Sequence, residues 1–180
     1  LFEWSSRPID RAVEIVSSMP ELNNLTLLTD LYQLTMAQSY FAEKRFAEAT
    51  FSVFVRSYPA NRGYFVCAGL DDVLHFLEDF AFDARAIEYL AAQKLFSEEF
   101  LRYLSELRFT GDVWAIPEGR IVFKEESLLE LSAPIIQAQI VETLIINQLH
   151  LQTMIATKAA RCVHASGGRA LVDFALRRTH

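Results

Sequence analysis

Residues 132–168 read SAPIIQAQIVETLIINQLHLQTMIATKAARCVHASGG and contain the longest helical pattern in the chain. No Gly or Pro occurs from residue 135 to residue 165, and Pro134 stands where the first turn of a helix tolerates proline. Apolar residues lie on almost every side of this segment, as is typical of a helix that is buried on several faces. We therefore predict one long helix that ends before Gly167, or two shorter helices separated by a break near Asn147–His150.

A short apolar segment follows the glycine pair, and we predict a strand over Ala170–Leu176. A helix, a glycine turn and an apolar strand with charged residues at its carboxyl end are typical of the start of an α/β barrel. We expect the α/β fold class, with an α+β domain over residues 25–133 followed by the first helix and strand of an incomplete barrel over residues 134–180. Residues 1–24 are interpreted either as a peripheral extension or as a segment with a real first helix.

The region before the long helix mixes helical and strand periods. Thr50–Arg56 alternates apolar and polar residues, which predicts a strand, and residues 70–77 have the i, i+3, i+4, i+7 spacing of an amphipathic helix. The same patterns predict further helices over residues 30–43, 84–93 and 97–107, and further strands over residues 113–116, 121–123 and 128–131.

The composition excludes several classes of protein. The chain has 180 residues, is 52% hydrophobic and 22% charged, and carries a formal net charge of −6, which indicates a globular protein and disfavours a nucleic-acid-binding surface. No apolar run is long enough for a transmembrane helix, so we expect no membrane partner. Cys67 and Cys162 provide neither a disulfide framework nor zinc-ligand spacing, and we expect a reducing cytoplasm.

Candidate binding residues gather near the end of the chain. Arg177 and Arg178 would follow the last predicted strand, where guanidinium groups suit a phosphate or carboxylate, and Phe174 could stack on a flat ring. An exposed basic strand end beside a core Phe explains the same residues equally well. No histidine pair has metal-ligand spacing, and neither a Walker A sequence nor a GxGxxG sequence occurs.

Three other places in the chain carry an aromatic or basic residue of interest. Tyr32 lies one turn into the helix predicted over residues 30–43, where its ring either packs or faces a ligand. Lys158 and Arg161 share a face near the end of the long helix, where they either complement the helix dipole or hold an anionic substrate. Arg56 and Arg62 form a second basic turn, which we interpret as a solvated face.

Several blocks of sequence occur in an order that indicates a known family. They are Thr29–Ala37 (TDLYQLTMA), Phe54–Arg56, Arg62–Leu70 (RGYFVCAGL), Gly111–Gly119 (GDVWAIPEG), Gln152–Thr153, Ile155–Arg161 and Phe174–Arg178 (FALRR). Together they resemble the nicotinate phosphoribosyltransferase family over about residues 25–180.

The resemblance implies a type II phosphoribosyltransferase. Its members join nicotinate to phosphoribosyl pyrophosphate, giving nicotinate mononucleotide and pyrophosphate with coupled ATP hydrolysis, and Mg²⁺ accompanies the pyrophosphate. The reaction is the entry to NAD salvage. The implied fold is an α+β amino-terminal domain beside an irregular α/β barrel, and the implied assembly is a homodimer with a shared active site.

The resemblance also assigns substrate-binding roles to the candidate residues. Tyr32 matches a tyrosine that reaches the pyridine ring from the adjacent subunit, and Phe174 matches the aromatic residue on the other side of that ring. Arg177 falls at the phosphoribosyl part of the ligand, with Arg178, Lys158 and Arg161 as further candidates. Two departures are Ala175, where the family has glycine, and Ser127, where it usually has proline.

The family's phosphorylated histidine lies downstream of residue 180, so the resemblance implies no catalytic residue and no metal ligand within this chain. We therefore expect an amino-terminal portion of the enzyme that has little or no turnover by itself. Two alternatives stay open. One is a related phosphoribosyltransferase that uses nicotinamide or quinolinate, and the other is a non-catalytic truncated domain or half of a split enzyme.

Overall fold

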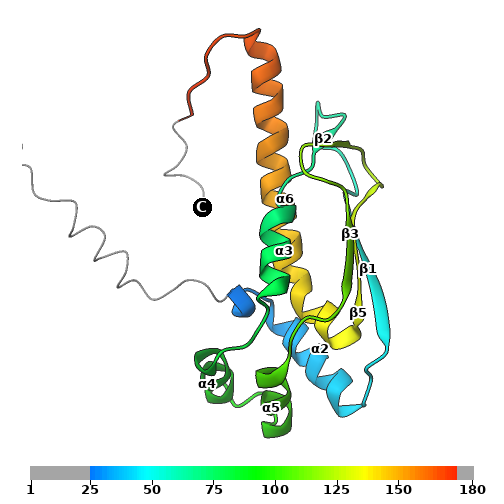
Figure 1. The fold of residues 1–180 in the computed structure, drawn as a ribbon, viewed down its shortest axis with the longest axis vertical. Coiled ribbons are helices and arrows are strands. Elements are labelled where there is room, and N and C mark those ends of the chain that lie inside the picture. Colours follow the sequence, from blue (N-terminus) through cyan, green and yellow to red (C-terminus); the bar gives the residue numbers. More distant parts are fainter. Residues whose placement is uncertain (1–24, 174–180) are drawn as a thin grey trace, which may run out of the picture.

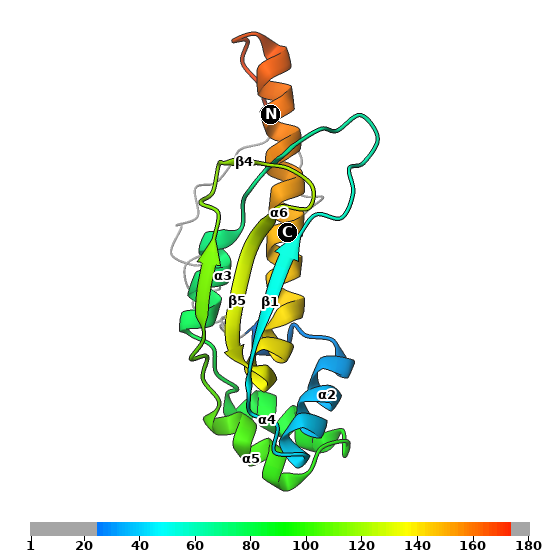
Figure 2. The same cartoon turned by 90° about the vertical axis from the view of Figure 1, so that its right-hand side faces the viewer.

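The computed structural model describes residues 25–173 and is organised around one long helix. Helix α6 covers Ile135–Ser166 without a break and ends at Gly167, whose left-handed conformation (φ 57°) stops it. Its 32 residues correspond to a length of about 48 Å. Figures 1 and 2 show α6 as the vertical axis of the molecule, with a sheet along its lower half. The prediction of a single helix is confirmed, and the break near Asn147–His150 does not occur.

The main sheet has three antiparallel strands in the order β1-β5-β3. They are β1 (Glu48–Phe54), β5 (Ser127–Pro134) and β3 (Asp112–Ala115). Phe51 lies opposite Leu131, and Trp114 lies opposite Glu130. Because alternate residues point to opposite faces, Leu129 and Leu131 are buried against the helices while Glu130 and Trp114 stay exposed. In β1 exposed and half-buried residues alternate, which confirms the alternation predicted from Thr50, although the strand ends at Phe54 rather than at Arg56.

A second sheet of two short strands lies beside the upper part of α6 (Figure 1). It pairs β2 (Phe65–Val66) with β4 (Ile121–Val122). A small apolar cluster forms beneath it from Phe65, Cys67, Val122 and Leu128.

Four shorter helices and one 3-10 turn complete the described part. They are η1 (Leu25–Leu27), α2 (Leu31–Ala42), α3 (Leu70–Glu78), α4 (Ala84–Ala92) and α5 (Glu98–Glu106). Side chains cap α4 and α5, because Asp83 accepts the N–H of Ala86 and Ser97 accepts the N–H of Phe100. All four helices were predicted from the period of their apolar residues.

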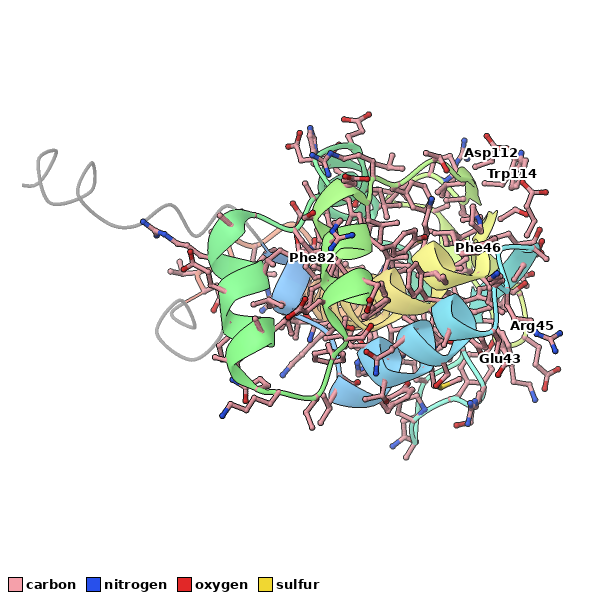
Figure 3. All side chains as sticks on the ribbon, turned by 90° about the horizontal axis from the view of Figure 1, so that it is seen from below. Glu43, Arg45, Phe46, Phe82, Asp112 and Trp114 are labelled. Carbon is pink, nitrogen blue, oxygen red and sulfur yellow. The ribbon has the colours of Figure 1, made fainter. Side chains whose placement is uncertain are left out.

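The main core lies where the sheet, α2, α5 and the first half of α6 meet. Phe100 is fully buried there, and its ring centroid is 5.6 Å from that of Phe41 and 6.3 Å from that of Tyr103. Seen from below, Phe82 lies among the helices, whereas Asp112 and Trp114 project from the far edge of the molecule (Figure 3). The first half of α6 thus shares a core with residues 25–133, while the domain boundary near Ala133 stays a prediction.

The strand predicted over Ala170–Leu176 is not formed in its described part. Residues 170–173 are exposed and have no regular secondary structure, and Leu171 and Val172 are 55% and 73% exposed. A strand requires a neighbour for its backbone N–H and C=O groups, and within residues 25–173 none lies beside this segment. The rest of the predicted strand lies outside the described residues. Between residues 25 and 173, no helix is long and apolar enough to span a bilayer.

Candidate functional site

Tyr32 stands in the first turn of α2 with about half of its surface exposed, at 52%. The next residue, Gln33, is completely buried. Of the two readings of Tyr32, the structure favours a ring that faces outward over a ring that packs in the core. An exposed aromatic ring held at its hydroxyl end is suited to contact a flat ligand.

A hydrogen-bonded group of polar side chains holds the Tyr32 hydroxyl. Gln33 Nε2 donates to Tyr32 Oη at 2.7 Å and to Glu142 Oε2 at 2.9 Å. Gln139 Nε2 donates to Gln33 Oε1, and it also lies 3.4 Å from Glu142 Oε2. Since Gln139 and Glu142 belong to α6, this group ties the start of α2 to the first half of the long helix.

A second contact fixes the start of the same helix. Thr143 donates from its hydroxyl to Asp30 Oδ2 at 3.1 Å, and the Thr29 hydroxyl donates to the carbonyl of Ile140 at 3.1 Å. Asp30 occupies the capping position of α2 but makes no side-chain hydrogen bond to that helix. The amino-terminal end of α2 is therefore held by contacts with α6 and not by a side-chain cap of its own.

Negative charge surrounds the phenol. Partial burial, then Glu142, then Asp30 raise the pKa of Tyr32, whereas the hydrogen bond from Gln33 lowers it. With the pKa above its ordinary value, the phenol stays protonated at neutral pH. It is therefore able to donate a hydrogen bond.

Lys158 and Arg161 are exposed side chains of the second half of α6. Sixteen positions separate Glu142 from Lys158, which is about 24 Å along the helix axis. Within this chain, the structure does not bring Lys158 and Arg161 to Tyr32. The predicted substrate-binding residues Phe174, Arg177 and Arg178 lie outside the described residues.

Arg62 is half-buried, so the interpretation of its turn as a solvated face is wrong for this residue. Its guanidinium carbon lies 5.9 Å from the centre of the Phe65 ring, and Nη1 donates to the sulfur of Met154 at 3.4 Å. Its Nε is buried and has no hydrogen-bond partner among residues 25–173. The charge is kept in the fold by an aromatic face and a thioether, both of which are weak partners.

A groove of about 780 Å³ runs between β1 and the middle of α6. Its lining is largely apolar and includes Phe54, Phe65, Ile146 and Met154, together with Glu142. The residue that accepts from Gln33 is therefore also part of this groove.

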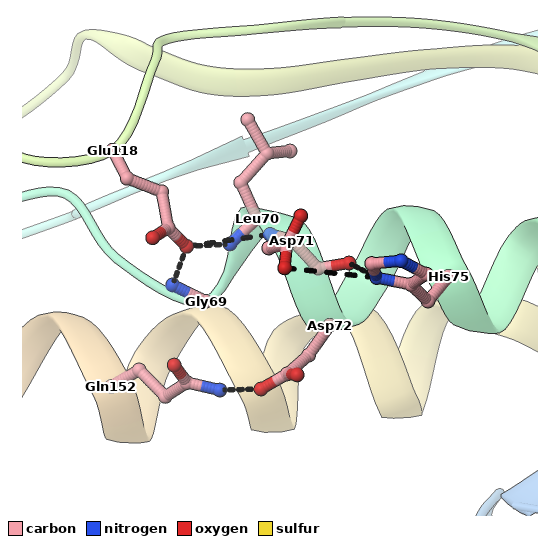
Figure 4. Close-up of polar contacts among 7 residues, drawn as sticks. All are labelled: Gly69, Leu70, Asp71, Asp72, His75, Glu118 and Gln152. Carbon is pink, nitrogen blue, oxygen red and sulfur yellow. Dashed lines mark hydrogen bonds and ion pairs between the residues drawn. The ribbon is translucent and has the colours of Figure 1, made fainter.

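The start of α3 is fastened by a carboxylate from a distant turn (Figure 4). Glu118 Oε1 accepts the backbone N–H groups of Gly69, Leu70 and Asp71 at 2.6, 2.7 and 3.3 Å. Gln152 of α6 donates to Asp72 in the same turn. A negative charge is favourable there, because the first N–H groups of a helix have no partners inside the helix.

Two buried threonines of α6 hold the segment that leads into α3. Thr157 Oγ1 accepts the N–H of Val66 at 2.9 Å, and Thr153 Oγ1 lies 3.2 Å from both the N–H and the C=O of Ala68. These contacts align β2 and the start of α3 with the second half of α6, the half that carries Lys158.

Comparison with known proteins identifies the family. The family model described as the nicotinate phosphoribosyltransferase (NAPRTase) N-terminal domain matches residues 27–150. The chain belongs to the nicotinate phosphoribosyltransferase family. The family resemblance of the sequence and the expected α/β fold class are thereby confirmed.

Two bacterial enzymes are among the curated relatives that match this chain. A nicotinate phosphoribosyltransferase of Mycobacterium tuberculosis is 53% identical over 154 residues, covering 86% of this chain and 33% of the relative. The nicotinate phosphoribosyltransferase of Bacillus subtilis is 38% identical over 159 residues, covering 88% and 32%. The chain therefore spans about a third of the length of these relatives.

Solved structures agree with this assignment. The crystal structure of human nicotinic acid phosphoribosyltransferase matches with a TM-score of 0.75 and 32% identity, covering 84% of this chain and 31% of that one. Nicotinate-nucleotide pyrophosphorylase from Pyrococcus furiosus matches with a TM-score of 0.67 over 91% of this chain and 35% of its own. At 20% identity, the second likeness shows only a common fold.

Tyr32 was predicted from the sequence, but Gln33 and Glu142, which hold its hydroxyl in place, were not. Gln33 and Glu142 are 109 positions apart, so no local spacing relates them. The only signal was the position of Gln33 within the Thr29–Ala37 block, which marks a family pattern without giving a role.

Proposed function

We propose that the protein carrying this chain is a nicotinate phosphoribosyltransferase. It forms nicotinate mononucleotide and pyrophosphate from nicotinate and phosphoribosyl pyrophosphate, with coupled ATP hydrolysis, as a step of NAD salvage in the cytoplasm. Membership of the family is the observation that carries this proposal. The exposed ring of Tyr32, fixed at its hydroxyl by Gln33, supports it as a surface for the pyridine ring.

The chain's own residues have a limited part in this reaction. Tyr32 is proposed to contact the pyridine ring, and Lys158, Arg161, Arg177 and Arg178 to face the anionic phosphoribosyl donor, with Phe174 on the second face of the ring. As the bond to pyrophosphate breaks, the ribose gains positive charge and the leaving group gains negative charge. Cationic side chains that face the leaving group stabilise that change.

Mg²⁺ and ATP are proposed as participants. The reason for Mg²⁺ is that pyrophosphate departs as a polyanion. When bound, Mg²⁺ would neutralise part of that charge. Residues 25–173 contain no group of three or more His, Cys, Asp or Glu side chains able to hold a metal ion. The described residues thus do not fit a resident metal site, and we derive no step through one.

A site shared between two copies of the protein is also proposed. Glu142, which contacts Tyr32 through Gln33, lies about 24 Å along α6 from Lys158. This distance supports a shared site, because it exceeds the length of one nicotinate mononucleotide. In a homodimer, Tyr32 of one protomer and the cations of its partner would face the same ligand. The groove beside β1 adds an apolar surface on which another part of the protein could pack.

The test is an assay of the full-length protein that contains this chain, with nicotinate, phosphoribosyl pyrophosphate, ATP and Mg²⁺. Formation of nicotinate mononucleotide is expected, and Tyr32→Ala should raise the KM for nicotinate by about tenfold or more. Tyr89→Ala serves as a control, because Tyr89 is similarly exposed, at 58%, but stands on α4 rather than on α2. A full-length protein that forms no nicotinate mononucleotide would overturn the proposal.

The same assay separates the alternatives. Comparing turnover of nicotinate, nicotinamide and quinolinate distinguishes related phosphoribosyltransferases. We also propose that residues 1–180 alone have little or no turnover. A non-catalytic domain would instead bind a protein partner while showing no thermal shift with nicotinate or with the phosphoribosyl donor.

A further inference from the structure

The orientation of the Gln33 amide is fixed by its neighbours. An ionised carboxylate only accepts hydrogen bonds, so the side of the amide that faces Glu142 Oε2 at 2.9 Å must be the nitrogen. The amide oxygen then faces Gln139, whose Nε2 donates to it. Gln33 is completely buried and Gln139 is 5% exposed, so an amide turned the other way would leave buried polar atoms facing atoms of their own kind.

This orientation determines the role of the Tyr32 hydroxyl. The Gln33 nitrogen that faces Glu142 also lies 2.7 Å from Tyr32 Oη, and an amide nitrogen can only donate. The phenol oxygen therefore accepts, and its own hydrogen is left to donate elsewhere. Within residues 25–173 the structure shows no acceptor for that hydrogen, and the Tyr32 side chain is 52% exposed.

The surrounding charge keeps the hydrogen on the oxygen. Glu142 and Asp30, the acidic groups that face the phenol from α6 and from the start of α2, both raise the pKa of Tyr32 after the effect of partial burial. A protonated phenol whose oxygen accepts the Gln33 N–H is held in place at its hydroxyl end.

We propose that Gln33, fixed by Glu142 and Gln139, is a positioning residue that holds the Tyr32 hydroxyl and thereby fixes the face that the Tyr32 ring presents to the bound pyridine substrate. Gln33 and Glu142 do not touch the ligand in this arrangement. The identity of that ligand as nicotinate rests on the proposed function. The donation of hydrogen bonds by Gln33 to Glu142 and Tyr32 is independent of the proposed function.

A double-mutant cycle in the full-length protein tests the coupling. Gln33→Met keeps the length of the side chain but removes the donor, and should raise the KM for nicotinate by about tenfold while the KM for phosphoribosyl pyrophosphate changes less than about twofold. In the Tyr32→Phe background, the same substitution should add less than about a threefold further loss. If the two losses multiply in full, Gln33 does not act through the Tyr32 hydroxyl and the proposal fails.

Gln38→Met is the matched control. Gln38 is on the same helix, accepts the N–H of Ser97 at 2.8 Å and donates to the carbonyl of Leu95 at 3.2 Å. This substitution removes two hydrogen bonds, where Gln33→Met removes three, and it lies five positions further along α2. Its KM for nicotinate should match that of the unsubstituted protein, so an equal rise in both variants would point to general destabilisation and contradict the proposal.

A second measurement needs no turnover. With 3-fluorotyrosine introduced at position 32 of the full-length protein, ¹⁹F NMR follows the ionisation of this phenol alone. Gln33→Met should raise its pKa, because a donated hydrogen bond is lost, and Glu142→Gln should lower it, because a negative charge is lost. If both pKa values shift in the same direction, or if neither shifts, Gln33 does not donate a hydrogen bond to Tyr32 and the proposal fails.

These readouts separate the two proposals. If the pKa shifts are opposite but no nicotinate mononucleotide forms, the proposed function fails while the positioning role holds. If nicotinate is converted but the shifts agree in sign, the positioning role fails. Should Gln33→Met not fold, Gln33→Asn takes its place, because the shorter amide no longer reaches Tyr32 Oη, and an unchanged pKa in that variant contradicts the proposal.

Discussion

Glu118 Oε1 lies 2.6 Å from the backbone nitrogen of Gly69, although 49 positions separate the two residues. Gly69 is the capping residue of α3 and has no side chain with which to cap it. The Glu118 carboxylate takes over this function and accepts two further N–H groups of the same helix start. The turn after β3 is thereby fastened to α3, and α3 is fastened to α6 through Asp72 and Gln152 (Figure 4).

Replacing Glu118 should therefore destabilise the fold. Glu118→Ala leaves three N–H groups without their acceptor, and we expect the free energy of unfolding to fall by about 1–2 kcal/mol. Glu118→Gln keeps an acceptor but loses the charge, so about half of that loss is expected. Urea unfolding measures both values.

Glu88→Ala is the control for this experiment, because Glu88 is exposed in the middle of α4. It should change the free energy of unfolding by no more than about 0.5 kcal/mol. A Glu118→Ala variant as stable as this control would show that the cap contributes nothing measurable.

The helices and strands were predictable because their signals are local. Alternation marked β1, a 3.6-residue period marked α3, and the absence of Gly and Pro marked α6. The strand predicted over Ala170–Leu176 could not be judged in the same way, because an apolar segment becomes a strand only beside a pairing partner.

The polar contacts of the candidate site were not predictable. Gln33 looks like a surface residue of α2, yet it is completely buried, because Glu142 and Gln139 satisfy its amide from α6. Tyr32 was found through the family pattern, and only the fold shows that its ring is exposed and its hydroxyl held. Glu118 was likewise quoted within a block, with no signal that it caps α3.

Gly69 should not tolerate a side chain. Its φ is +96°, and a Cβ there would lie 2.7 Å from the backbone oxygen of Gln148. Gly69→Ala thus combines an unfavourable backbone conformation with a clash against α6, and we expect a loss of about 2 kcal/mol or more in the free energy of unfolding.

Two other glycines separate these two effects. Gly119 also has a positive φ, of +78°, but nothing lies within 4 Å of the position that a Cβ would take, so Gly119→Ala should cost only about 1 kcal/mol. Gly63 has open space and no positive φ, so Gly63→Ala should be close to neutral. Equal losses at all three positions in thermal or urea unfolding would contradict this account.

His75 should make stability depend on pH. Its Nδ1 lies 2.9 Å from the carbonyl oxygen of Asp71, and this contact, followed by the Asp71 carboxylate and then Glu78 and Asp79, raises the pKa of His75. A pKa that is higher in the folded state means that the charged form stabilises the fold. The contribution is fully present below the ordinary histidine pKa of about 6.5, and is lost as the pH rises through the folded value.

The measurement compares the unsubstituted chain with His75→Gln at about pH 5.5 and about pH 8.5. The difference in unfolding free energy should be larger at the lower pH and should shrink in high salt, since the side chain is exposed. In an Asp71→Asn background the pH dependence should weaken. A larger difference at the higher pH would reverse the sign and refute the assignment.

The two cysteines should differ strongly in reactivity. Cys67 is 1% exposed, and burial followed by the charge of Glu118 raises the pKa of its thiol, so little of the reactive thiolate is present at neutral pH. Cys162 is exposed near the end of α6. Ellman's reagent should therefore label one thiol rapidly in the native chain and the second at least about tenfold more slowly, because labelling of Cys67 requires the fold to open. Cys162→Ser should abolish the rapid phase and leave the slow one, and a rapid phase that persists in this variant would show that Cys67 is accessible.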